Sequence, residues 1–248
     1  MTVVLVHGVP ETTHVWDQLR EELGRSDVVT PALPGFESPR PGGFDATKED
    51  YVAWLVAEIE RMVSDDGPVD LVGHDWGGGF TVRLVSTRPD LVRSWVTDAA
   101  GIGSADFEWH DFAKIWQTPG AGEEFWDQQL GLPDEERAAV FEASGVPKPA
   151  AVDLASRVDR TMADCILDLY RSAVDVGKEW GPDFVDIPAP GLVLAPSDDP
   201  FLSEPTARAG ADRAGARVEK LDGVGHWWML QDPARGARVL EGFWTSLD

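Results

Sequence analysis

One short segment constrains the fold of this chain more than any other. Residues 73–79 read Gly-His-Asp-Trp-Gly-Gly-Gly and directly follow the strand-like run at residues 69–72. The pattern Gly-x-X-x-Gly after a buried strand is typical of the nucleophile elbow, a strained strand-to-helix turn that lifts its central side chain above a sheet. The segment therefore predicts an α/β sheet with Asp75 at the carboxyl end of one of its strands. On this motif alone, a glycine-rich turn in which Asp75 only caps the next helix remains an alternative.

The aspartate at the centre of this turn restricts the chemistry, because serine is the usual occupant. A carboxylate that attacks an ester carbonyl would form an anhydride, which lies energetically uphill, so acyl substrates are disfavoured. Attack on a saturated carbon that bears a leaving group instead gives an ordinary ester of Asp75, which water can later hydrolyse. Strained ethers and carbon–halogen bonds fit this chemistry.

The length, charge and cysteine content of the chain exclude several classes of protein. A chain of 248 residues can form one large α/β domain, or a core with an inserted subdomain. The formal charge of −23 argues against a nucleic-acid partner, since phosphate backbones are bound chiefly by Lys and Arg. The single cysteine, Cys165, excludes an internal disulfide, and the apolar run at residues 2–6 is too short for a signal peptide or membrane span. These features predict a cytoplasmic protein without a membrane partner.

Strand-like and helix-like segments alternate at both ends of the chain, which predicts a doubly wound, mostly parallel α/β sheet. The strand candidates are residues 3–6, 28–29, 69–72, 95–97, 192–194 and 218–221, and the helix candidates are residues 48–62, 80–86, 206–213 and 233–247. The alternation stops between them, where helix-like segments at residues 133–142 and 152–174 predict an inserted cap. We therefore expect a core of residues 1–103 and 187–248 and a helical cap of residues 104–186.

Three further segments complete a pattern with Asp75. His7-Gly8-Val9-Pro10 follows the first strand, residues 195–200 contain Asp198 and Asp199 after a later strand, and Gly225-His226 follows the last strand. The order nucleophile, acid, histidine is that of α/β-hydrolases. Over essentially its whole length the chain resembles the aspartate-nucleophile branch of that superfamily, the epoxide hydrolases and haloalkane dehalogenases, and epoxide hydrolases most. The usual sheet of these families has two more strands before the one that here begins at Thr2.

The resemblance implies a role for each of these residues. His226 would be the general base, Asp199 the acid that orients it, and the N–H groups of Val9 and Trp76 an oxyanion hole. Asp198 and Asp98 remain alternatives for the acid. His7 is expected to brace its turn, and the other histidines, His14, His74 and His110, have no comparable sequence context.

The leaving group depends on the cap. Tyr170, in Leu169-Tyr170-Arg171, is similar to one of the two ring-opening tyrosines of epoxide hydrolases, although a packed structural tyrosine is the alternative. Phe112 stands where the second tyrosine would be, so an indole N–H of Trp109 or Trp116 would have to orient the oxygen instead. Haloalkane dehalogenases hold the halide with a tryptophan after the nucleophile and often an Asn after His-Gly. Here Trp76 matches the tryptophan, and Val9 replaces the Asn.

The sequence therefore predicts an epoxide hydrolase that forms a vicinal diol. A haloalkane dehalogenase and a non-catalytic ligand-binding homologue are the alternatives. The expected partners are water and a small apolar organic substrate, without a cofactor or metal, and either a monomer or a homodimer fits. The residues expected to line the substrate pocket are Trp109, Phe112, Trp116 and Trp227.

Overall fold

A sheet of six parallel strands forms the centre of the described structure. In this computed structural model the backbone of residues 1–248 is described, together with all side chains except those of Ser64, Asp65 and Asp66. The strands lie in the order β2-β1-β3-β4-β5-β6 and comprise β1 (Val3–Val6), β2 (Val28–Val29), β3 (Val69–Gly73), β4 (Val92–Thr97), β5 (Gly191–Pro196) and β6 (Arg217–Leu221). The predicted parallel α/β sheet is confirmed.

Burial explains which segments form the central strands. Every residue of β1, β3 and β5 is buried, as expected for parallel strands covered on both faces. β6 lies at one end of the sheet and exposes several side chains. The polar β6 sequence is therefore tolerated at an edge.

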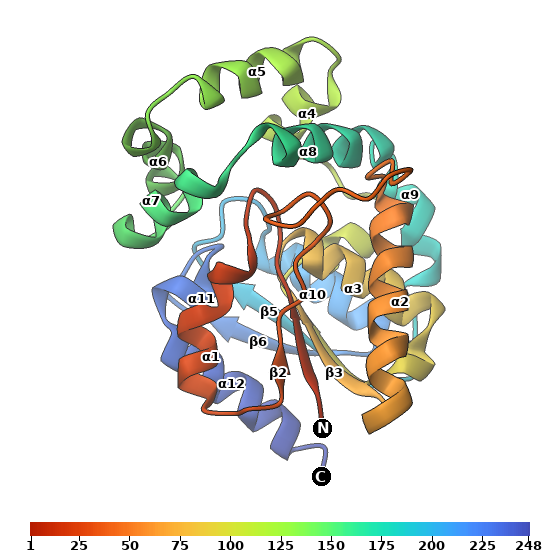
Figure 1. The fold of residues 1–248 in the computed structure, drawn as a ribbon. Coiled ribbons are helices and arrows are strands. Elements are labelled where there is room, and N and C mark those ends of the chain that lie inside the picture. The colour runs from red at the N-terminus through yellow and green to blue at the C-terminus, as the bar shows by residue number, and fades with distance from the viewer.

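Helices cover both faces of the sheet (Figure 1). α1 packs against α12 on one face, and α2 packs against α3 on the other. The core helices are α1 (Asp17–Leu23), α2 (Lys48–Asp66), α3 (Trp76–Thr87), α10 (Glu204–Ala214), α11 (Trp228–Gln231) and α12 (Pro233–Thr245), with short 3-10 helices at η1 (Thr13–Trp16), η2 (Pro89–Leu91), η3 (Ala100–Gly103) and η4 (Gly181–Asp183). None of the described helices combines the length and apolar character needed to cross a membrane.

A helical insertion between β4 and β5 lies above one edge of the sheet (Figure 1). It contains α4 (Asp111–Gln117), α5 (Ala121–Leu130), α6 (Asp134–Ala143), α7 (Lys148–Arg157) and α8 (Arg160–Ser172), followed by α9 (Val176–Trp180). The helix-like segment at residues 152–174 is in fact divided between α7 and α8. The break occurs because Asp159 is extended and its side chain accepts the Met162 N–H at 2.8 Å, which starts a new helix.

One buried side chain ties the insertion together. The Arg137 guanidinium donates to the main-chain carbonyls of Gln129, Leu132, Ala155 and Val158, at 2.8–3.1 Å. These carbonyls belong to α5, to α7 and to the segments that follow each helix. Arg137 thereby holds consecutive parts of the insertion in one arrangement.

Candidate active site

The turn from β3 into α3 holds Asp75 in a strained conformation, with φ of 49° and ψ of −121°. Glycines make this turn possible, because no side chain fits beside it. A Cβ on Gly73 would lie 2.2 Å from the Gly77 carbonyl oxygen, and a Cβ on Gly77 would lie 2.2 Å from that of Val6. The predicted elbow geometry is therefore present, and Asp75 stands at the carboxyl edge of the sheet beneath the helical insertion.

Three groups contact Asp75. Its Oδ1 accepts the Val9 N–H at 2.8 Å, and its own N–H donates to Asp98 Oδ1 at 3.0 Å. Its Oδ2 lies 3.7 Å from Nε2 of His226. Burial alone would raise the pKa of the Asp75 carboxyl, but His226 and His74 outweigh burial and hold this pKa below its ordinary value. Asp75 is thus a carboxylate at neutral pH.

His226 is oriented by one of the three acids considered from the sequence. Its Nδ1 lies 3.0 Å from Oδ2 of Asp199, whose Oδ1 accepts the main-chain N–H groups of Phe201 and Leu202. Asp198 is exposed and bonds to Ser197 instead. The structure therefore places the His226 ring between Asp75 and Asp199.

The charge of His226 depends on both neighbouring carboxylates. Burial lowers the pKa of its imidazole, but Asp199 raises it more and Asp75 adds to the rise, giving a value of about 10. His226 is accordingly an imidazolium while Asp75 carries its negative charge.

A buried ion network lies beneath the elbow, formed by Asp98, a sequence candidate for the acid, and by His74 and Glu11, to which sequence reasoning gave no role. His74 Nδ1 lies 2.6 Å from Asp98 Oδ2, and His74 Nε2 lies 3.1 Å from Glu11 Oε1. Burial lowers the pKa of His74, but Asp98 and Glu11 outweigh it and raise that pKa well above its ordinary value. His74 is therefore an imidazolium between two carboxylates, and Asp98 is committed to it rather than to His226.

The same network reaches the loops on either side of Asp75. Glu11 Oε2 accepts the Gly8 N–H at 3.1 Å, and Glu11 Oε1 accepts the indole N–H of Trp227. The indole N–H of Trp228 donates to Asp98 Oδ2 at 2.8 Å. Glu11, which the sequence analysis did not single out, thus connects the turn that carries Val9 to the loop that carries His226.

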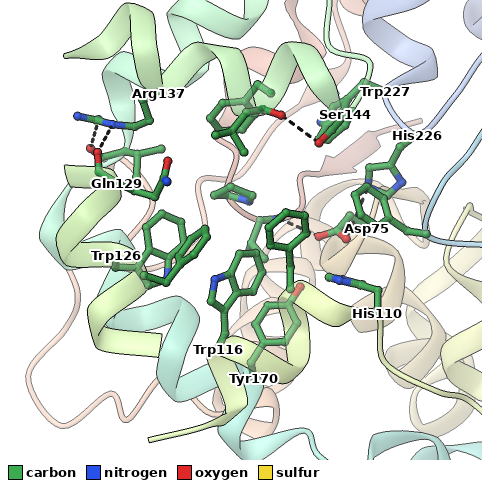
Figure 2. Close-up of a pocket in the computed structure, with 18 residues that line it drawn as sticks. Asp75, His110, Trp116, Trp126, Gln129, Arg137, Ser144, Tyr170, His226 and Trp227 are labelled. Atoms are coloured by element: carbon green, nitrogen blue, oxygen red, sulfur yellow. Dashed lines mark hydrogen bonds and ion pairs between the residues drawn. The ribbon is translucent and has the colours of Figure 1, made fainter. Parts of the chain in front are cut away.

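Two cavities meet at the Asp75 carboxylate. The larger lies beneath the helical insertion and encloses about 710 Å³, part of it open to solvent (Figure 2). The smaller encloses about 490 Å³. Four residues line both: Asp75, His110, Phe201 and His226. The remaining walls are mostly apolar and aromatic.

Two side chains of the insertion face Asp75 from the larger cavity. Figure 2 shows the Tyr170 hydroxyl and the His110 ring pointing toward the part of the cavity that holds the carboxylate. Burial and the Asp75 charge raise the pKa of Tyr170 well above its ordinary value, so this phenol keeps its proton. Tyr170 thus lines the larger cavity with a protonated hydroxyl.

His110 is a cavity residue that sequence reasoning missed. Its Nδ1 accepts the Ala113 N–H at 3.3 Å, so the ring proton of neutral His110 belongs on Nε2. Burial lowers the pKa of His110, which keeps the ring neutral at neutral pH. The sequence analysis predicts no helix at residues 111–117, so the position of His110 at the start of α4 is seen only in the structure.

The predicted aromatic residues occupy different positions around the cavities. Trp116 and Phe112 line the larger cavity, although Phe112 is 40% exposed, and Trp109 lines the smaller one. The Trp109 indole N–H donates to the Ala173 carbonyl at 2.9 Å, so it is not free for a leaving group. Trp227 lines the larger cavity while its N–H holds Glu11. The buried indole N–H groups of Trp76 and Trp116 make no hydrogen bond among the described residues, although the Trp76 N–H lies near enough to the Tyr170 hydroxyl to lower the pKa of that phenol.

Among the described residues, no group of His, Cys, Asp or Glu side chains is arranged to hold a metal ion. The alpha/beta hydrolase family matches residues 3–239 of the chain, a span that contains every residue of this site. The chain belongs to this family.

Curated relatives of this alpha/beta hydrolase carry several different names. Lipase LipV of Mycobacterium tuberculosis is 33% identical over 38% of this chain and 35% of its own length. The (E)-2-((N-methylformamido)methylene)succinate hydrolase of Acinetobacter baylyi is 25% identical over 80% and 72%. A haloalkane dehalogenase of Mesorhizobium japonicum is 28% identical over 69% and 52%. The match thus spans about a third of LipV and about half of the dehalogenase.

Solved structures reproduce the fold over nearly the whole chain. An epoxide hydrolase from Vigna radiata superposes with a TM-score of 0.78 at 18% identity, covering 99% of this chain and 91% of that one. A loop variant of a haloalkane dehalogenase from Bradyrhizobium elkanii gives 0.75 at 19% identity, covering 99% and 89%. At these identities the likeness establishes the α/β-hydrolase fold with its helical insertion, and does not single out epoxide hydrolases.

Proposed function

We propose that this alpha/beta hydrolase cleaves a carbon–oxygen or carbon–halogen bond at a saturated carbon through a covalent ester of Asp75. The observation that carries the proposal is the position of the Asp75 carboxylate. It opens into two apolar cavities, accepts the Val9 N–H and lies 3.7 Å from His226. A carboxylate in this setting is a nucleophile for alkyl carbon rather than for an acyl group.

The two steps follow from the charges at the site. In the first step a carboxylate oxygen of Asp75 forms a bond to the substrate carbon, and the bond to the leaving group breaks. Esterification removes the negative charge of Asp75, so the pKa of His226 falls and the ring releases its proton to water in the larger cavity, which is partly open to solvent. Neutral His226 then takes a proton from the water that attacks the ester carbonyl, and Asp199 stabilises the resulting imidazolium. Cleavage of the ester bond restores the Asp75 carboxylate, and the released product oxygen takes the proton from His226.

The oxyanion of the second step develops on the Asp75 carboxyl group. The Val9 N–H already donates to Oδ1 at 2.8 Å, so it needs no rearrangement to stabilise the added charge. Trp76 begins α3, where first-turn N–H groups have no partner inside the helix. Its N–H is the second donor of the proposed oxyanion hole.

An epoxide oxygen is the leaving group that the cavity donors support. The opening ring becomes an alkoxide, which needs a donor able to give up a proton. Tyr170 is a buried, protonated phenol that can supply this proton, and the Nε2–H of neutral His110 can hydrogen-bond the same oxygen in place of the second tyrosine of epoxide hydrolases. The product would be a vicinal diol.

A halide is the second candidate, because the buried Trp76 indole N–H makes no hydrogen bond among the described residues. A departing halide needs N–H donors and no proton. Haloalkane dehalogenases also occur among both the curated relatives and the solved structures, so the comparisons support this candidate better than the epoxide. Against it, Val9 occupies the place of the Asn that often supplies the second donor.

Purified protein incubated with epoxide and haloalkane panels separates the two candidates. Diol formation supports the epoxide, whereas halide release without diol rejects it. A single turnover in heavy-oxygen water should leave the label in the peptide that contains Asp75. Absence of that label from a substrate that is turned over rejects the ester. If no substrate is turned over and ligands still bind, the protein is a non-catalytic binding homologue.

A further inference from the structure

The carboxylate of Asp75 lies where two separate apolar cavities meet, and this junction constrains the substrate. The larger cavity extends into the helical insertion toward Trp126 and Val140. The smaller one is lined by a different set of apolar residues, which includes Ile102, Phe107 and Trp109. A terminal epoxide or primary halide has one substituent and would use only one of these spaces.

We propose that the substrate carries apolar substituents on both sides of its reacting group, with the longer or aromatic one in the larger cavity. This inference rests on the proposed ester of Asp75 and adds the class of substrate. It holds for either leaving group, so it describes internal epoxides or secondary halides. A substituent that enters the smaller cavity leaves water and buries apolar surface, which favours binding and the transition state alike.

The charges along both cavities further disfavour a substrate that carries a negative charge. Arg137 lines the larger cavity, but its guanidinium donates to four main-chain carbonyls. The smaller cavity is lined by Asp75, Asp98 and Asp199 and by no Lys or Arg among the described residues. The His226 imidazolium lines both cavities but is already paired with Asp75 and Asp199. A substrate carboxylate would therefore find acids and no unpaired cation among the described lining residues, at a substantial desolvation cost.

The smaller cavity can be tested with a matched series of epoxides. Each carries a phenyl group on one ring carbon and hydrogen, methyl, ethyl or propyl on the other. We expect kcat/KM to rise about fourfold per added carbon until the smaller cavity is full, because each buried CH₂ is worth roughly 0.8 kcal/mol. If halide proves to be the leaving group, the corresponding primary and secondary phenylalkyl bromides replace the epoxides.

Variants of Phe107 change the size of the smaller cavity in both directions. Phe107 is half-buried, lines only this cavity and does not contact Asp75 or His226 in the described structure. Phe107→Trp should make kcat/KM stop rising at a shorter substituent, and Phe107→Ala should let kcat/KM rise up to a longer one. Val140→Trp, at the wall of the larger cavity, is the matched control and should lower kcat/KM for the whole series without changing its slope.

The outcomes separate this inference from the proposed function. Label in the Asp75 peptide together with a rising series that responds to Phe107 supports both. If the label is found but kcat/KM stays constant or falls along the series, and does so equally in both Phe107 variants, the smaller cavity does not receive a substituent. This result overturns the two-cavity inference and leaves the proposed function intact. Turnover without label overturns the ester and, with it, the basis of the inference.

Discussion

The region below Asp75 is a network of charged groups, whereas the region above it is mainly aromatic. Below it, the Glu11 and Asp98 carboxylates and the His74 imidazolium bond to one another and to nearby N–H groups. Above it, the walls are aromatic, and the buried indoles of Trp116 and Trp126 have no partner among the described residues. The lower region therefore fixes the position and charge of the nucleophile, and the upper region determines which molecule reaches it.

The largest expected effect is a loss of turnover when Asp75, which lies between the two regions, is replaced. Asp75→Ala should lower turnover by about 10⁴-fold or more, because no other described group can form the ester. Its effect on folding should be smaller, since the Asp75 side chain is partly exposed and alanine keeps the same positive-φ backbone position. Kinetics and urea unfolding measure both. Asp198→Ala, at an exposed acid, is the control, and equal losses in the two variants would contradict the assignment.

Glu11→Ala tests the lower region and should mainly affect stability. It leaves the His74 imidazolium with one carboxylate and deprives the Gly8 and Trp227 N–H groups of their acceptor. Removing one partner of a buried ion pair costs about 3–5 kcal/mol, measurable as a lower urea midpoint. Glu22→Ala, at an exposed acid, should change stability by less than about 0.5 kcal/mol. A normal midpoint for Glu11→Ala would show that the network does not support the fold.

Tyr170→Phe tests the upper region and should mainly affect rate. Loss of the phenol proton should lower kcat for epoxides by about 10²-fold, with little change in the free energy of unfolding. The only other tyrosine provides a control, because the Tyr51 hydroxyl donates to the Pro34 carbonyl at 2.9 Å, away from both cavities. Tyr51→Phe should therefore lose stability and keep kcat. The reverse pattern would assign Tyr170 to packing alone.

The smallest expected effect concerns the positive charge of His226, which lies beside Asp75. The folded pKa of His226 is about 10, above its unfolded value of about 6.5. Its contribution to stability is therefore complete below about pH 6.5 and is lost as pH rises through about 10. Asp75→Asn removes the charge and should lower the pKa of His226, measured by NMR titration of the ring. An unchanged pKa would mean that esterification does not release the base.

Local patterns predicted most of the fold, whereas contacts between distant residues determined what the sequence could not reveal. The six strands, the elbow and the insertion follow from short apolar runs and glycine spacing. Glu11 and His74 are 63 positions apart, and Glu11 and Trp227 are 216 apart, so no local pattern connects them. His110 was missed for a similar reason, because its place beside Tyr170 depends on how α4 packs against α8. The break between α7 and α8 was missed because the apolar spacing runs across it.

The arginine that ties the insertion together also affects how this protein can change over evolution. Arg137 binds main-chain carbonyls, and these persist whatever side chains the neighbouring residues carry. The aromatic residues of the cavity wall can therefore be substituted while the helical insertion keeps its fold. Substrate range is accordingly the property most open to selection or engineering, while the residues beneath Asp75 tolerate little substitution.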